Sequence, residues 1–319
     1  MKNRLMNRVV NKYILHNRSI FFENDDEVEQ FLEKRRDENS KKHKQPSSLN
    51  VKANLDKLSL GDMQVFRFNF RHESNNKILY LHGGYNTLQP SPFHWRLLDK
   101  LALNTLHEVV LPIYPKAPEF HLEDTYNAIK EVYDELVAEV GVDHIVLMGD
   151  GSGGGLAMRF VQSLIEENEP VPSKLFLISP LLDATLSNKM ITEDLEDEDI
   201  LVSRFGVNEL MKVWSNGLPL TDKRVSPLYG ELRGLPPVYM YGGGKEIQNP
   251  DMKELARLLE GYGQFVEFNE YPKMVHDFPL YPIRQSHKVI KQITKAIRKK
   301  TTSTFVKSHY QSTRSLTEN

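Results

Sequence analysis

The sequence alternates short apolar runs with longer amphipathic stretches from about residue 50 onwards. The short runs have the length of strands, and the stretches between them repeat apolar residues at helical spacing. Strands are predicted at 63–70, 77–81, 108–112, 144–148, 174–178, 237–241 and 265–271, and the clearest helices at 123–140 and 153–165. Strands separated by helices form parallel sheets that helices cover on both faces. The pattern therefore predicts an α/β fold with a mainly parallel central sheet flanked by helices.

The first 48 residues have a different pattern. Apolar residues recur at helical spacing between positions 6 and 14, with basic residues on the other side, and a second helical pattern covers 26–36. A polar linker at 37–48 ends in a Pro-Ser-Ser triplet, which is typical of a domain boundary. We expect residues 1–48 to form an N-terminal helical lid and linker over a pocket. A basic amphipathic helix can also lie on a membrane surface, and the sequence leaves that alternative open.

The main domain is expected to cover residues 49–299, with one interruption. Between about 183 and 234 the alternation of strands and helices stops, which predicts a lid insertion. The acidic run at 193–199 lies inside this insertion. Such runs are usually solvated faces, so no cation site is predicted there. The residues at 300–319 are rich in Ser, Thr and charge and are expected to form a flexible tail.

Composition narrows the classes of function. The chain has 319 residues, and its 41 Lys and Arg nearly balance its 43 Asp and Glu, which argues against a nucleic-acid partner. It has no cysteine, which excludes disulfides, thiolate metal sites and a cysteine nucleophile. No run approaches the roughly 18 apolar residues of a membrane span, and the basic start of the chain lacks the apolar core of a signal peptide. We therefore expect a cytoplasmic protein that needs neither metal nor cofactor.

A glycine pair directly follows the predicted strand at 77–81, in the motif His82-Gly83-Gly84. Glycines at such a place let backbone N–H groups approach a ligand closely, as an oxyanion hole requires. A bare turn would explain the same residues. The motif therefore gains weight only from the two motifs that follow it along the chain.

A run of glycines with the sequence GDGSGGG lies at 149–155, between a predicted strand and a predicted helix. A glycine-rich turn of this kind can bind a phosphate at a helix N-terminus. However, no Lys-Ser or Lys-Thr pair follows as in a P-loop, and a dinucleotide site normally lies in the first strand–helix unit. A nucleophile elbow, whose glycines let strand and helix pack tightly around a strained central residue, explains the run better.

His276, in a loop just past the last predicted strand, has the position of a general base.

Taken together, the chain resembles the hormone-sensitive-lipase-like group of α/β hydrolases, in the bacterial lipase and esterase branch that has an N-terminal helical lid. The likeness covers about residues 50–297. It rests on YLHGG at 80–84, PFHW at 92–95, YPKAPE at 114–119 and SP at 179–180, besides the elbow. The resemblance implies the α/β-hydrolase fold and hydrolysis of carboxylic esters, with His276 as general base. It also implies an oxyanion hole formed by Gly83, Gly84 and the N–H of Ser152.

The elbow departs from the family pattern at its central residue. The family's Gly-Asp-Ser-Ala-Gly-Gly is replaced here by Gly-Asp-Gly-Ser-Gly-Gly at 149–154, so Gly151 takes the nucleophile position and Ser152 the alanine position. In such an elbow the central side chain points into the pocket, and the next residue begins the helix. Ser152 would attack a substrate only if the turn shifted by one residue. It is kept as an alternative nucleophile.

The acid of the triad is expected shortly before a Pro-Asp pair, in the segment GGGKEIQNPD at 242–251. Counting back from Asp251 places Glu246 at the acid position, and glutamate can orient a histidine as aspartate does. A register one residue earlier would place Lys245 there and abolish the role. Asp251 itself is the fallback acid, although a helix N-cap suits it better.

These residues predict a carboxylic-ester hydrolase whose activity is weak or absent. Deleting a triad serine typically costs on the order of a million-fold in turnover. The alternative is a catalytically inactive protein that binds a small acyl or apolar ligand, or a partner, in the same pocket. The expected ligand is a small ester or acyl molecule, and no oligomeric state is predicted.

Overall fold

The computed structural model describes residues 20–70 and 75–299. Within them lies an eight-stranded sheet with the strand order β1-β2-β4-β3-β5-β6-β7-β8. β2 is antiparallel to both of its neighbours, and the six strands from β4 to β8 in this order are parallel. The strands are β1 (Leu55–Leu60), β2 (Met63–Phe68), β3 (Lys77–Leu81), β4 (Glu108–Pro112), β5 (Ile145–Asp150), β6 (Lys174–Ile178), β7 (Val238–Gly243) and β8 (Val266–Tyr271).

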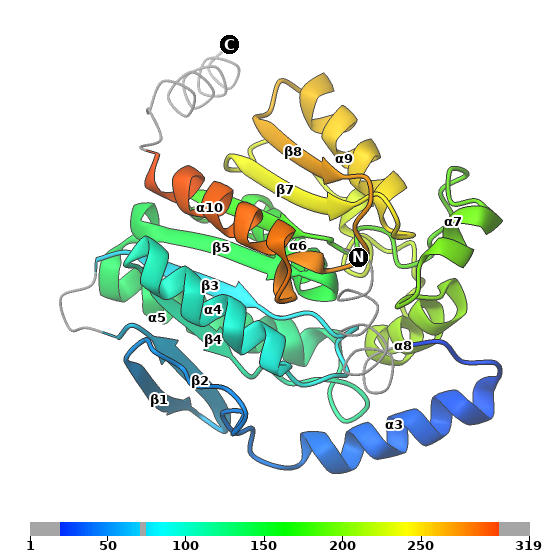
Figure 1. The fold of residues 1–319 in the computed structure, drawn as a ribbon, viewed down its shortest axis with the longest axis horizontal. Coiled ribbons are helices and arrows are strands. Elements are labelled where there is room, and N and C mark those ends of the chain that lie inside the picture. Colours follow the sequence, from blue (N-terminus) through cyan, green and yellow to red (C-terminus); the bar gives the residue numbers. More distant parts are fainter. Residues whose placement is uncertain (1–19, 71–74, 300–319) are drawn as a thin grey trace.

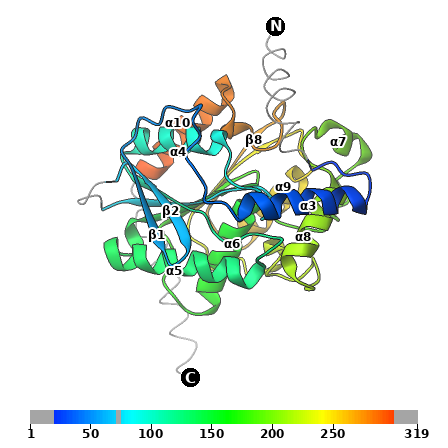
Figure 2. The same cartoon turned by 90° about the horizontal axis from the view of Figure 1, so that it is seen from below.

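Helices cover both faces of this sheet. α4 (Pro92–Thr105) and α10 (Arg284–Arg298) pack against each other on one face, and α5 (Leu122–Val140) and α6 (Gly151–Glu166) lie on the other (Figure 2). The predicted α/β fold with a mainly parallel sheet is confirmed. The other α-helices of the described residues are α3 (Asp25–Asn39), α7 (Glu193–Glu198), α8 (Arg204–Ser215) and α9 (Asn249–Gly261). α3, α7 and α8 gather beyond the ends to which the parallel strands point (Figure 1).

The predicted elements agree closely with this architecture. β3, β4 and β6 have the predicted bounds, and the other predicted elements differ by one to three residues at an end. β5 extends to Asp150 because that residue still pairs with Ile178 of β6, so α6 begins at once with Gly151 rather than at 153. β1 was not predicted, because its polar and only half-buried residues give a weak alternation.

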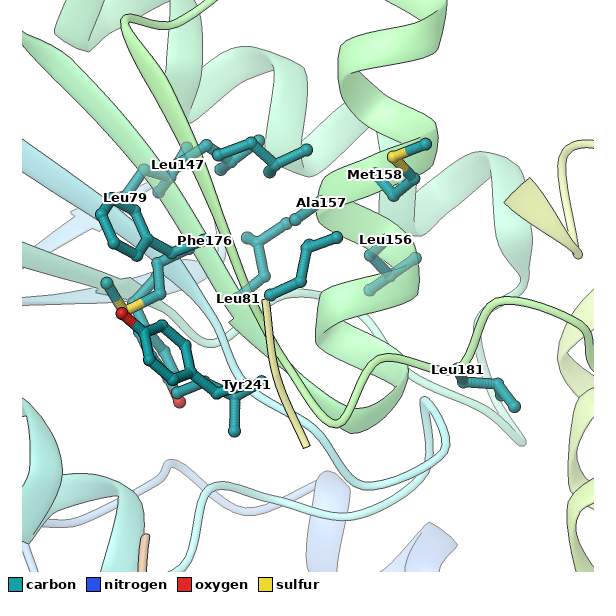
Figure 3. Packing of buried hydrophobic residues seen from close by; sticks show 14 of the residues in the cluster. Leu79, Leu81, Leu147, Leu156, Ala157, Met158, Phe176, Leu181 and Tyr241 are labelled. Atoms are coloured by element: carbon teal, nitrogen blue, oxygen red, sulfur yellow. The ribbon is translucent and has the colours of Figure 1, made fainter. Parts of the chain in front are cut away.

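The core around α6 fixes the position of the turn that precedes it. Leu79, Leu81 and Leu147, from the neighbouring strands β3 and β5, are fully buried. Figure 3 shows these side chains gathered beside α6. Glycines let the helix come this close: a Cβ on Gly153 would lie 2.2 Å from the carbonyl oxygen of Leu81.

The N-terminal strap, which we define as residues 20–48, runs from α8 to the antiparallel edge of the sheet. At one end, Ser203 Oγ donates to the carbonyl oxygen of Ile20 (2.8 Å). In the middle, Asn39 Nδ2 donates to the carbonyl oxygen of Thr87 (2.9 Å). At the other end, the N–H of His43 donates to a side-chain oxygen of Gln64 in β2 (2.7 Å). The predicted linker thus starts three residues late, after α3 ends at residue 39, and it is tied to the main domain. The lid role of residues 1–48 stays a prediction, and the expected first helix and the tail at 300–319 lie outside the described residues.

The acidic run at 193–199 is not uniformly solvated. Its first six residues form α7, which contains no buried residue, but Asp199 is 1% exposed. Asp199 accepts hydrogen bonds from the N–H groups of Leu201, Val202 and Ile247. The prediction of a solvated face is therefore wrong for this residue, because three backbone amides replace the water that would otherwise hydrate its carboxylate.

In the part of the chain that the structure describes, no helix is both long and apolar enough to span a bilayer.

We expect Gly153→Ala to destabilise the fold by about 3 kcal/mol, because the new methyl group would overlap the backbone of β3. The matched control is Gly261→Ala at the end of α9, where no atom lies within 4 Å of the new Cβ. That change should be neutral or stabilise by up to about 1 kcal/mol. Urea unfolding of both variants measures the difference, and equal midpoints would contradict the close packing.

Candidate active site

The turn between β5 and α6 places Gly151 at the carboxyl end of the sheet. Gly151 has φ +51°, a conformation that costs other residues about 1–2 kcal/mol. A Cβ built on it would collide with nothing: its nearest neighbours are Asp277 Oδ2 at 3.4 Å and His276 Nε2 at 3.5 Å. A side chain at this position would therefore point at the imidazole of His276.

Ser152 lies in the first turn of α6 and is 2% exposed. Its hydroxyl oxygen accepts a hydrogen bond from the N–H of Asn86 (3.3 Å). Among the described residues, no hydrogen bond joins this hydroxyl to His276. The structure thus directs Ser152 toward the loop after β3, and the glycine before it faces the histidine.

Glu246 lies directly against His276. Glu246 Oε2 is 2.8 Å from His276 Nδ1, and both residues are buried. Ser179 Oγ donates to the other carboxylate oxygen of Glu246 (3.0 Å), and the N–H of Gly243 donates to it as well (2.5 Å). These donors hold the carboxylate in place, so that it can orient the ring and fix its tautomer.

The two neighbouring candidates for the acid have other partners. Lys245 Nζ pairs with Glu198 at the surface (2.8 Å). Asp251 accepts from Asn188 Nδ2 (2.9 Å) in the first turn of α9. The N-cap of that helix is Gln248, so the prediction of an N-cap role for Asp251 is wrong.

The other ring nitrogen of His276 faces two side chains that the sequence did not single out. Asp277 Oδ2 lies 3.2 Å from Nε2, and the hydroxyl of Tyr85 lies 3.5 Å from it. Asp277 has φ +52°, and this left-handed backbone turns its carboxylate back onto the neighbouring ring. The only sequence signal for Asp277 is that it adjoins His276.

Charge in this cluster is closely balanced. Burial alone would lower the pKa of His276, but Asp277 and Glu246 outweigh burial and raise that pKa well above 6.5. Burial raises the pKa of Asp277 to about 7 against the opposing attraction of His276. Burial also raises the pKa of the nearby Asp199 to about 6. Glu246 and Asp277 therefore favour the protonated form of His276.

The glycine pair after β3 lies over the elbow. A Cβ on Gly83 would lie 2.5 Å from Asp150 Oδ2, and a hydrogen bond from the Gly83 amide helps to lower the pKa of Asp150. That contact draws the Gly83 amide toward Asp150. Gly84, with φ +128°, and Ser152, whose N–H lies in a helix first turn without an intrahelical partner, are the better-supported amide donors. The oxyanion role of Gly83, Gly84 and Ser152 stays a prediction.

Asp150, the last residue of β5, is held by two side chains directly before the elbow. Tyr80 donates to one of its carboxylate oxygens (2.7 Å), and His94 Nε2 lies 3.0 Å from the other. Burial by itself would raise the pKa of Asp150, but His94 and Tyr80 reverse this and lower it.

Among residues 20–70 and 75–299, no group of three or more His, Asp or Glu is arranged to hold a metal ion.

We expect Glu246→Gln to lower the pKa of His276, because it removes one of the two carboxylates that stabilise the imidazolium. Titration of the histidine ring by NMR measures the shift. Asp251→Asn, which removes a buried carboxylate bound to Asn188, is the matched control and should leave the His276 titration in place. An unchanged pKa in Glu246→Gln would refute the contact.

Residues 78–280 match a protein family described by the α/β hydrolase fold. The chain is 30% identical over 219 residues to a triacylglycerol lipase of Mycobacterium tuberculosis, covering 68% of this chain and 45% of the lipase. It is 32% identical over 206 residues to an esterase of Acinetobacter venetianus, covering 64% of this chain and 68% of the esterase. The chain thus spans less than half the length of the first relative and about two thirds of the second.

Solved structures give the same picture. A Staphylococcus aureus protein to which an esterase function has been ascribed is 67% identical, with a TM-score of 0.90, covering 92% of this chain and all of that one. A hormone-sensitive lipase from a metagenome library is 26% identical, with a TM-score of 0.75, covering 92% of this chain and 95% of the lipase. The names of these relatives point to hydrolases that act on esters.

Proposed function

The chain belongs to the α/β-hydrolase fold family, in its hormone-sensitive-lipase-like group, and we propose that it is a carboxylic-ester hydrolase of low turnover. Low turnover follows from Gly151, which stands where the family keeps its serine. The proposal draws on the names of the relatives for the reaction class and on the site for the rate. The substrate is a small ester held over the elbow.

One observation carries the proposal. A Cβ on Gly151 would lie 3.5 Å from His276 Nε2, and Glu246 supports the other side of that ring at 2.8 Å. A serine at position 151 would thus place its hydroxyl beside an imidazole that a carboxylate supports on the other side. Oxyanion stabilisation and substrate binding alone give about 10³–10⁴-fold catalysis over water. An ester bound here would be attacked by water instead of serine.

A second function remains a candidate, because His276 Nε2 is already paired with Asp277 (3.2 Å). In that case the protein binds a small acyl or apolar ligand, or a partner, without hydrolysing an ester. The two functions differ in one measurable respect: only the hydrolase releases alcohol faster than the uncatalysed blank.

We expect Gly151→Ser to raise hydrolysis of p-nitrophenyl butyrate on the order of 10³-fold or more, because it restores the nucleophile in front of His276. The strained φ should cost about 1–2 kcal/mol of stability. Gly151→Ala carries the same strain without the hydroxyl and should gain nothing. A fast parent enzyme with no gain in the serine variant would contradict Gly151 as the vacant nucleophile position.

A serine-directed fluorophosphonate should leave the parent protein unlabelled and add one phosphonyl group to the Gly151→Ser variant. The Ser152 hydroxyl is directed at Asn86 and not at His276, so it lacks a base to activate it. Intact-mass spectrometry reads the outcome. Adding His276→Ala to the serine variant should abolish the label, and an adduct on Ser152 in the parent would contradict this assignment.

A further inference from the structure

The glycine at the elbow leaves a small space lined by polar groups. A serine there would fill it with a hydroxymethyl group, whose volume is close to the roughly 30 Å³ that a water molecule takes in the liquid. The neighbours of the Cβ position are Asp277 Oδ2 at 3.4 Å, His276 Nε2 at 3.5 Å and the Cα of Gly83 at 3.7 Å. A carboxylate and an imidazole therefore face the point from which the serine oxygen would attack.

Asp277 is built into this position. Its N–H donates to Ser179 Oγ (3.1 Å), and the same hydroxyl donates to Glu246 (3.0 Å), so one serine links the backbone of Asp277 to the carboxylate of Glu246. Asp277 is 9% exposed. Its Oδ1 is buried and has no hydrogen-bond partner among the described residues. A buried acceptor without a donor is costly, and such groups are typical of functional sites.

We propose that Asp277 is the general base for a water molecule held over Gly151, so that this chain hydrolyses esters without an acyl-enzyme. The inference rests on the proposed function and assigns its proton transfer. Asp277 Oδ2, 3.4 Å from the Cβ position of residue 151, is the acceptor for the water. The amides of Gly84 and Ser152 supply donors for the ester carbonyl oxygen.

Each proton in the reaction has a donor and an acceptor. The water oxygen bonds to the acyl carbon, and its proton passes to Asp277. The bond from the acyl carbon to the alcohol oxygen then breaks, and the His276 Nε2–H gives its proton to that oxygen. Asp277 finally returns a proton to Nε2 across the 3.2 Å contact, which regenerates the resting pair. Ester and water become acid and alcohol, and no other reactant is needed.

The titration of the cluster suits this role. The pKa of Asp277, raised to about 7 by burial, gives a carboxylate base near neutral pH, where general bases work best. The pKa of His276 is raised well above 6.5, so the ring stays protonated and can act as the acid. Hydrolysis should rise with pH as Asp277 ionises, and fall again when His276 loses its proton. The titratable groups facing this pair are Glu246, Asp150, Asp199, Tyr80 and Tyr85.

The central test is Asp277→Asn in the otherwise unchanged chain. We expect it to lower kcat for p-nitrophenyl butyrate by on the order of 100-fold or more, with a smaller change in KM, because the amide cannot accept the proton. The rising limb of the pH profile should disappear. Asp251→Asn is the matched control: it removes another buried carboxylate whose pKa is raised to about 7, away from His276, and should keep both the rate and the profile.

Two results overturn the assignment: a parent rate no higher than the spontaneous blank, or an Asp277→Asn rate equal to that of the parent. The Gly151→Ser variant separates this failure from that of the proposed function. If the serine variant hydrolyses the ester while Asp277→Asn has no effect on the parent, only the role of Asp277 fails. If the serine variant is as silent as the parent, the ester-hydrolase proposal fails with it.

Attack on the ester by Asp277 itself is the competing mechanism, and it predicts different kinetics. A general base moves a proton in the rate-limiting step, so the parent should turn over more slowly in D₂O and show no burst of p-nitrophenolate. The Gly151→Ser variant, which forms an acyl-enzyme, is the positive control for a burst. A burst in the parent, or equal rates in H₂O and D₂O, would overturn the general-base role.

Discussion

Contact between backbones at the turn after β5 is the constraint on which the rest of the site depends. α6 lies so close to β3 and to the segment after β6 that Gly153 and Gly155 have no room for a Cβ. Asp150, held by Tyr80 and His94, fixes the strand end at the same point. The packing of the neighbouring residues therefore sets the position and φ of Gly151, and no side chain at 151 is needed. The turn can therefore keep this geometry with a glycine at position 151.

Electrostatics distinguish this site from an elbow that carries a serine. A serine requires a neutral imidazole whose Nε2 accepts the hydroxyl proton. Here Glu246 lies on one side of the ring and Asp277 on the other, and both stabilise the charged form. The protonated ring is therefore favoured before any reaction begins. Because Asp277 lies at Nε2, its carboxylate takes the place of the imidazole as the group that can accept a proton.

Much of this architecture could be predicted from periodicity and spacing. The parallel strands are apolar runs whose ends coincide with glycine or polar residues, which is why β3, β4 and β6 have the predicted bounds. Counting back from Asp251 selected Glu246, whose carboxylate contacts His276, because the loop between β7 and α9 is short and leaves little freedom. By contrast, the contact of Asp277 with Nε2 depends on a left-handed φ, which the sequence pattern does not encode. Asp199 was missed for a related reason: a run of acids does not show which carboxylate will meet three amides.

The N-terminal strap has a consequence for the order in which the chain folds during synthesis. The hydrogen bond between Ile20 and Ser203 joins residues 183 positions apart. Translation adds about 5–20 residues per second, so the partner of Ile20 leaves the ribosome roughly ten seconds or more after Ile20 itself. Closing so large a loop also costs more chain entropy than a local contact does. The segment that is made early is therefore among the last to dock, and until then the face it crosses is open to chaperones and other chains.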